Sequence, residues 1–320
     1  MKKLNPINTF SEGNKVQGFY LCTDKHLRYT RSGDLYIDIE LRDITGHISA
    51  KIWDNVSTLN EKFNAGNAVA ISGLVEIFLD QPQLIIKKIN KATVQHYSRY
   101  GFDPSMVVPS SRKNLKKMWV QIEQLIDGIK NPSIKKLVKS IYSSNKKRLL
   151  VIPGSVNMQY CYRSGYIEQI ISMSLIAKRI CTLYRVDRDL VLAGIFLYGI
   201  GKVKEINSEY ETDFTMEGHL IGHSVISRDI VKEAISRMKN FSIKLSKMIE
   251  HIILNCSNEL EFSPKEQPSF SEALLVNQII LLDSKMNIMA NVLAEDKEKG
   301  DFTNRHNYFR IPLFKNNESE

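Results

Sequence analysis

The spacing of apolar residues changes once along this chain, and that change limits the fold more than any other feature of the sequence. Between residues 16 and 90, short runs of alternating or β-branched residues are separated by turn signals such as Ser32-Gly33-Asp34 and Ala65-Gly66-Asn67. Such runs predict β-strands. From about residue 112, apolar residues recur at i, i+3 and i+4, the spacing of one helix face. We therefore expect a multidomain chain, β first and all-α second.

Five strand segments are predicted in the N-terminal part, and their order points to one kind of barrel. The segments are VQGFYLC, DLYIDIEL, HISAKIW, NAVAISGLVEIF and QPQLIIKKI. A helix-compatible stretch from Val56 to Phe63 lies between the third and fourth. Three strands, a short helix and two strands is the order of an OB-fold, whose open face commonly binds single-stranded nucleic acid or oligosaccharide. We expect an N-terminal OB-fold barrel that binds nucleic acid over residues 1–92.

Helical segments are predicted in most of the remaining chain, and a length of 320 residues agrees with more than one domain. Residues 91–112, with Gly101 and Pro104, predict a linker. We divide the chain into the barrel, a linker and basic helical connector over 93–150, a helical domain over 151–314 and a flexible tail over 315–320. We also expect the chain after Lys299 to be loose. The predicted helices are Asn114–Ile129, Ser133–Ser143, Tyr166–Tyr184, Asp187–Ile200, Glu217–Met238, Ile243–Leu254 and Ser271–Leu293.

The sequence disfavours a membrane-spanning protein, a secreted protein, and a protein held together by disulfides or structural zinc. The longest apolar run, Leu190 to Gly201, is about 12 residues, whereas a membrane-spanning helix needs about 20. The N-terminus carries polar residues and Pro6 where a signal peptide would need an apolar run. The four cysteines are scattered without a CxxC pair, so neither a disulfide framework nor a structural zinc site is indicated. We expect a cytoplasmic protein without a membrane partner.

Positive charge is concentrated in one segment. Residues 112–148 hold eleven lysines and arginines against two acids, so this segment accounts for the formal net charge of +9. Such a concentration is typical of a surface that binds a polyanion, and also of a solvated helix face that keeps a protein soluble. The lysines that we assign to nucleic-acid binding here are Lys135, Lys136, Lys139, Lys146 and Lys147.

Aromatic and basic side chains on the predicted strands are further candidate contacts. In a barrel that binds nucleic acid, exposed rings stack on bases while lysines neutralise phosphates. We assign Trp53 to the surface because it ends a strand and Lys51 lies on its face at period two. Lys87 and Lys88 complete the predicted site, and core packing is the alternative for each of the strand aromatics Phe19, Tyr20, Tyr36, Trp53 and Phe78.

Four strings in the helical part resemble one enzyme family. They are AGIFLYGIGKVKE (193–205), GHLIGH (218–223), ELEFSPKEQPSFSEALL (259–275) and LLDSKMN (281–287). In this order they resemble the YhaM-type 3′-to-5′ exoribonucleases, in which an OB-fold precedes an HD-superfamily phosphohydrolase domain. The resemblance extends from Val16 to Phe314 and implies an HD fold for residues 151–314.

The resemblance also implies where a metal would be held. In that family a His, a consecutive His-Asp pair and a distant Asp bind a divalent cation that activates water. These positions fall on Gln169, on Tyr198 and Gly199, and on Ile280, so all four ligands are replaced. A buried Asp without its cation is costly, which favours losing the carboxylates together with the metal. We expect a degenerate HD domain with no catalytic residues and no cofactor, its pocket refilled as core.

A few residues around that position are retained. His223, the last residue of GHLIGH, survives, while an auxiliary histidine pair of the family falls on Cys256 and Ser257. Lys202 and Lys285 remain at positions that adjoin the phosphate-binding cleft of the resembling enzymes. We assign both lysines to nucleic-acid binding, since they can hold a phosphate; ion pairs within the domain are the alternative, and the lysines supply no activated water.

The expected function is binding of single-stranded nucleic acid, RNA in the first place and DNA in the second, by an inactive relative of exoribonucleases. One alternative is an active 3′-to-5′ exoribonuclease that holds Mn²⁺ or another divalent metal on His219, His223, His251 and Asp283. His219 and His223 are at i, i+4 on one predicted helix, a spacing that can chelate a metal. A second alternative is a module that binds a partner protein of the RNA-decay or replication machinery. A homo-oligomer is compatible with each of these.

Overall fold

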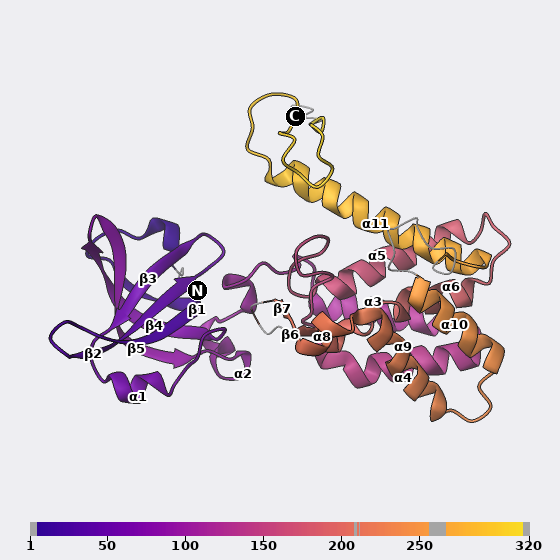
Figure 1. Ribbon diagram of the computed structural model, residues 1–320, viewed down its shortest axis with the longest axis horizontal. Coiled ribbons are helices and arrows are strands. Elements are labelled where there is room, and N and C mark those ends of the chain that lie inside the picture. The colour runs from indigo at the N-terminus through magenta and orange to yellow at the C-terminus, as the bar shows by residue number, and fades with distance from the viewer. Residues whose placement is uncertain (1–4, 208–209, 211, 256–266, 316–320) are drawn as a thin grey trace. The chain divides into compact units, whose positions relative to one another are not determined.

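The chain forms two compact units in the computed structural model, which describes residues 5–207, 210, 212–255 and 267–315 (Figure 1). The barrel unit comprises residues 1–112 and 207–213, and the helical unit comprises residues 113–206 and 214–320. The predicted order of a β part followed by a helical part is therefore confirmed.

The barrel unit contains a closed barrel of five strands in the order β1-β2-β3-β5-β4. Neighbouring strands are antiparallel except β3 and β5, which are parallel. A short helix, α1 (Val56–Asn60), lies between β3 and β4, which is the arrangement of an OB-fold. The strands are β1 (Lys15–Tyr29), β2 (Leu35–Arg42), β3 (His47–Ile52), β4 (Ala68–Phe78) and β5 (Gln81–Lys91).

Alternation of side chains closes this barrel around an apolar interior. On β2, Ile37, Ile39 and Leu41 are all buried, and they pair in register with buried residues of β3. The residues between them point to the outer face, because successive side chains of a strand face opposite sides. The outer face of β2 and β3 is therefore available for polar and aromatic side chains.

The segment that follows the barrel belongs to the barrel unit as far as Arg112. It forms α2 (Val94–Tyr97) and two single 3₁₀ turns, Ser98–Tyr100 and Pro104–Met106. Phe102 packs on Phe19 of β1 with ring centroids 4.9 Å apart, and Val107 and Val108 are buried in the same small cluster. The boundary between the units thus falls inside the segment 93–150 that the sequence pattern kept together, because apolar residues before Arg112 pack on the barrel.

The helical unit is built around one core that includes most of α6. Every residue from Leu190 to Leu197 is buried, which explains the long apolar run in the sequence. The helices are α3 (Leu115–Asp127), α4 (Pro132–Leu149), α5 (Gly165–Ile180), α6 (Arg188–Leu197), α7 (Lys202–Glu205), α8 (Met216–Leu220), α9 (His223–Ser236), α10 (Ile243–Asn255) and α11 (Ser271–Glu295); the short strands β6 (Ile206–Asn207) and β7 (Asp213–Phe214) pair with each other.

The single helix predicted from Glu217 to Met238 is wrong. It is divided into α8 and α9 at Gly222, which has φ 79° and ψ 155°. This conformation is open essentially to glycine alone, so the glycine ends one helix before the next begins. His219 lies in α8 whereas His223 is the first residue of α9, so the two histidines do not share a helix face as the sequence predicted.

Among the described residues, α11 is the one helix whose length and mean hydropathy of 1.2 would be enough to cross a membrane. Its residues Ala273, Val276 and Ile279 are buried in the same core as α6. Such packing is typical of a core helix in a folded domain, and we assign α11 to the core.

The prediction of a loose chain after Lys299 is also wrong for the residues described. Figure 1 shows a closed loop after the C-terminal end of α11. Thr303 N–H donates to the Leu313 carbonyl oxygen at 2.9 Å, and Lys315 Nζ lies 2.8 Å from Asp296 Oδ2 in a mostly buried ion pair. These contacts between residues distant in sequence fix the loop as far as Lys315, and residues 316–320 of the predicted tail lie outside the described residues.

Candidate functional sites

Three aromatic rings gather around one lysine on the outside of the barrel. Tyr36 of β2 and Trp53, which directly follows β3, are stacked with centroids 4.7 Å apart and planes 26° apart. Lys51 Nζ lies 5.3 Å from the Tyr36 centroid, 5.7 Å from that of Trp53 and 5.1 Å from that of Phe78. We call these four residues the aromatic cluster.

Strand alternation and one tight turn bring the aromatic cluster together. Tyr36 precedes the inward-facing Ile37, and Lys51 precedes the inward-facing Ile52, so both face outward. Phe78 is the last residue of β4, and the turn after it, Leu79-Asp80, has positive φ at both positions as in a type I′ hairpin. Trp53 is 41% exposed and Phe78 53% exposed, so large ring surfaces face solvent.

Lys51 forms no ion pair with an acidic side chain described in the barrel. Asp38 is its register partner across β2 and β3, but Asp38 Oδ2 lies 3.1 Å from Arg28 Nε. Among the described residues Lys51 has ring contacts and no ion pair. An ammonium held over ring faces in this way is stabilised by about 0.5–1 kcal/mol and keeps its attraction for an external anion.

Lys87 and Lys88 both face solvent because β5 carries a bulge. The pairing shifts from Ser72 with Lys88 to Gly73 with Ile86, which leaves Lys87 unmatched. A regular strand would turn one of two consecutive side chains inward. Gly73 is required here, since a Cβ at that position would lie 2.5 Å from the Ile85 carbonyl oxygen.

Four of the five lysines assigned to α4 are exposed, and Lys135 is partly buried. Lys139 Nζ is 3.2 Å from Asp127 Oδ1, and Lys146 Nζ lies 4.6 Å from the Trp119 ring centroid. The side chains of Lys135, Lys136 and Lys147 have no ion-pair partner among the described residues. Part of the predicted basic surface is therefore neutralised within the unit.

The four positions that the resemblance assigns to metal ligands are all buried in the helical unit. Gln169 lies in α5, Ile280 in α11, and Tyr198 and Gly199 directly follow α6. Neither the amide nitrogen nor the amide oxygen of Gln169 has a hydrogen-bond partner among the described residues. Three of these positions carry buried side chains and the fourth is a buried glycine, and the Gln169 amide is unsatisfied within the part of the chain that the structure describes.

Lys202 reaches into this part of the core. Its Nζ donates to the Gly154 carbonyl oxygen and lies 5.9 Å from the Tyr198 ring centroid. Burial lowers the pKa of Lys202 to about 8, and the nearby Glu205 opposes this shift. The assignment of Lys202 to nucleic-acid contact is therefore corrected, because its buried ammonium cannot reach an external strand. Lys285, on α11, is exposed.

Two of the alternative metal ligands have separate environments around α8 and α9. His219 is exposed, with its ring 5.2 Å from that of Phe214. Glu205 Oε1 accepts from the backbone N–H of His223 at 2.9 Å and lies 3.1 Å from His223 Nδ1. These hydrogen bonds lower the pKa of the Glu205 carboxyl against the effect of its burial, which alone would raise it.

The other two alternative ligands also have partners of their own. His251 Nε2 accepts from the Ser269 backbone N–H at 3.0 Å. Asp283 Oδ1 accepts from Ser172 and, at 3.3 Å, from Tyr160; burial raises the pKa of Asp283 and these hydrogen bonds oppose the rise. Within the described part of the chain no three His, Cys, Asp or Glu side chains are placed to hold a metal ion. Cys256 and Ser257 lie outside the described residues.

Tyr36 and Phe78 were not chosen from the sequence as interface residues. The sequence offers one indication for each residue. Tyr36 directly precedes the inward-facing Ile37, so strand alternation turns Tyr36 outward, and Phe78 lies beside a turn. Neither signal shows that the two rings meet at Lys51, which depends on strand pairing and on the turn that follows Phe78.

No protein-family model matches this chain. Solved structures that this chain resembles include the second OB-fold domain of replication protein A from Methanococcus maripaludis. The two are 14% identical, the match covers 27% of this chain and 92% of that chain, and the TM-score is 0.23. The p204 HINb domain has 16% identity, 28% and 47% coverage and a TM-score of 0.24. A replication protein A heterotrimer bound to ssDNA has 14% identity, 30% and 69% coverage and a TM-score of 0.23. These scores are low, so the fold assignment rests on strand order and helix position.

Proposed function

We propose that the barrel unit binds single-stranded nucleic acid, RNA in the first place, through the aromatic cluster. The observation that carries this proposal is the set of half-exposed rings around the ammonium of Lys51. Every base has a face that stacks on an aromatic ring, and a lysine beside the ring attracts the phosphate. In barrels of this type, strands two and three and the loops before strands two and five are the surfaces that bind oligonucleotides.

The elements of this barrel agree with that mode. Tyr36 and Lys51 come from β2 and β3, and Phe78 stands beside the turn that leads into β5. Stacking of one base on an aromatic residue is worth about 1–3 kcal/mol. Loss of the exposed Trp53 ring should therefore weaken binding by about 5- to 150-fold.

We also propose that the helical unit is a degenerate HD-type domain that serves as a scaffold in a protein resembling exoribonucleases. The residues at the four corresponding positions do not fit a divalent metal, since Ile280 and Gly199 offer no ligand atom in their side chains. The ammonium of Lys202 donates to the Gly154 carbonyl oxygen and lies beside the Tyr198 ring, so it packs within this core. No cofactor and no hydrolytic step is proposed for this unit.

The alternative of an active exoribonuclease gains no support from the geometry. Each of its four named ligands contacts a different residue: His219 contacts Phe214, His223 contacts Glu205, His251 contacts Ser269 and Asp283 contacts Tyr160. Metal-dependent hydrolysis needs several ligands around one cation and an open position for water.

The test measures binding and chain shortening together. Fluorescence anisotropy of labelled single-stranded RNA and DNA would compare the full chain with Trp53→Ala and with Tyr184→Ala, an exposed aromatic of the helical unit. We expect binding that only Trp53→Ala weakens, and no shortening of end-labelled RNA with or without Mn²⁺. Absence of binding would refute the barrel proposal, and Mn²⁺-dependent shortening lost in His223→Ala would refute the inactive helical unit.

A further inference from the structure

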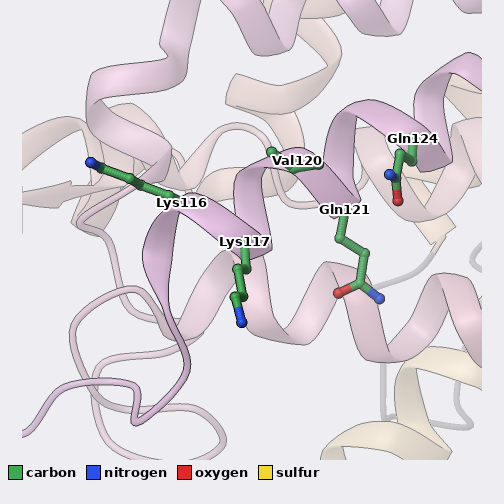
Figure 2. A pocket seen from close by; sticks show the side chains of 5 residues that line it. All are labelled: Lys116, Lys117, Val120, Gln121 and Gln124. Atoms are coloured by element: carbon green, nitrogen blue, oxygen red, sulfur yellow. The ribbon is translucent and has the colours of Figure 1, made fainter.

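The outer side of α3 carries charge that the barrel proposal does not use. A shallow hollow with a volume of about 430 Å³ lies along this helix (Figure 2). Figure 2 shows its side chains directed away from the helix axis on successive turns. The lining residues are Lys116, Lys117, Val120, Gln121 and Gln124.

The position of this hollow follows from the apolar pattern of α3. Met118, Trp119 and Ile122 are buried, as are Leu125 and Ile126, so the helix is fixed by one face. The hollow lies on the other face, where Lys117, Gln121 and Gln124 fall at i, i+4 and i+7. Residues at this spacing lie on neighbouring turns of one stripe, about 10 Å long at 1.5 Å per residue.

The two acids of α3 each have a partner that does not line the hollow. Glu123 Oε1 accepts from Trp119 Nε1 at 2.6 Å. Asp127 forms its ion pair with Lys139 of α4. The side chains of Lys116 and Lys117 have no acidic partner among the described residues, so the hollow has an uncompensated positive charge.

We infer that this α3 face is a second contact surface for single-stranded nucleic acid. Lys116 and Lys117 bind the phosphate backbone, and the amides of Gln121 and Gln124 hydrogen-bond base edges or sugars. An amide offers both donors and an acceptor; base edges can use both, whereas the carboxylate of an acidic peptide can use only the donors. The inference rests on the proposed function of the chain, and it places phosphate contacts on α3 where the sequence pattern pointed to α4.

The test compares two double variants that remove equal charge. Lys116→Gln with Lys117→Gln changes the α3 face, and Lys232→Gln with Lys244→Gln changes exposed lysines of α9 and α10 as the matched control. Glutamine suits a helix nearly as well as lysine, so both variants should fold. Each phosphate contact to a single strand contributes about 0.7 to the slope of log affinity against log salt. We expect the α3 variant to lose about 1.4 in slope and about 25-fold in affinity at 0.1 M salt, and the control to lose much less.

Three results would overturn the inference. The first is an α3 variant that binds as the wild type does while Trp53→Ala still weakens binding; the proposed function would then survive alone. The second is an equal loss in the control variant of α9 and α10. The third is an α3 face that binds a polyglutamate peptide, with this binding lost in the α3 variant while oligonucleotide binding is unchanged. If the wild-type chain binds no oligonucleotide, the proposed function fails together with the inference.

Discussion

Replacing Lys202 by methionine should stabilise the helical unit at pH 7 by about 2 kcal/mol. Lys202 is buried, and its pKa falls from 10.5 to about 8. Each unit of pKa shift corresponds to about 1.36 kcal/mol, so the charged form costs about 3 kcal/mol in the folded state. The variant loses the hydrogen bond to the Gly154 carbonyl oxygen, worth about 1 kcal/mol. Methionine has a similar volume and shape, so the packing cost should be small.

The stabilisation expected from Lys202→Met depends on pH. Below the folded pKa both the folded and unfolded states are protonated, and the full cost of the buried charge is present. Between about 8 and 10.5 the folded state releases its proton before the unfolded state does, so the wild type gains stability as pH rises. The advantage of Lys202→Met should therefore shrink to below about 1 kcal/mol at pH 9.5.

Urea unfolding followed by circular dichroism at the helix band would measure both proteins at the two pH values. Lys285→Met is the matched control, because Lys285 is exposed in the same unit and its replacement should change the free energy of unfolding by less than about 0.5 kcal/mol. A Lys202→Met protein less stable than the wild type at pH 7, or an advantage that is constant with pH, would refute the reasoning.

Three further predictions concern other positions. Gln169→Met should raise the free energy of unfolding by about 1–2 kcal/mol in urea, because it removes a buried amide without partners; a loss of stability would show that the amide is satisfied in solution. Gly222→Ala should cost about 1–3 kcal/mol in the same assay, because φ 79° with ψ 155° strains any other residue, and an unchanged midpoint would contradict this. Asp296→Ala should open the loop that Lys315 closes and speed trypsin cleavage after Arg305 and Arg310, whereas an unchanged cleavage rate would show that the ion pair does not hold the loop.

The barrel could be predicted because local pattern and tertiary structure agree there. Alternation of apolar residues on β2 predicts that Ile37 and Ile39 face the interior, as they do. The predicted strands agree with the observed ones to within a few residues, except at the end of β1. The surface position of Trp53 also agrees with prediction, while its role in binding stays a prediction. The cluster of Tyr36 and Phe78 around Lys51 depends on which strands pair, which no local pattern shows.

The helical unit shows where local pattern is insufficient. Apolar spacing continues through Gly222, so the sequence predicted one helix where the backbone makes two. The burial of Lys202 follows from its contact with Gly154, forty-eight residues away, and composition alone would place a lysine at the surface. The polar chain after Lys299 is fixed by Asp296 and Lys315, a pair whose energy depends on burial rather than on its sequence neighbours.

The bulge in β5 lets the length of the strand vary without moving the core. Gly73 pairs with Ile86 and Ser72 with Lys88, so the outward Lys87 is an extra residue between two correctly placed inward positions, Ile86 and Ile89. Removing one of the two adjacent lysines would restore ordinary alternation and leave every inward side chain in place. A single codon can therefore add or remove one positive charge on the outside of the barrel while the interior keeps its register.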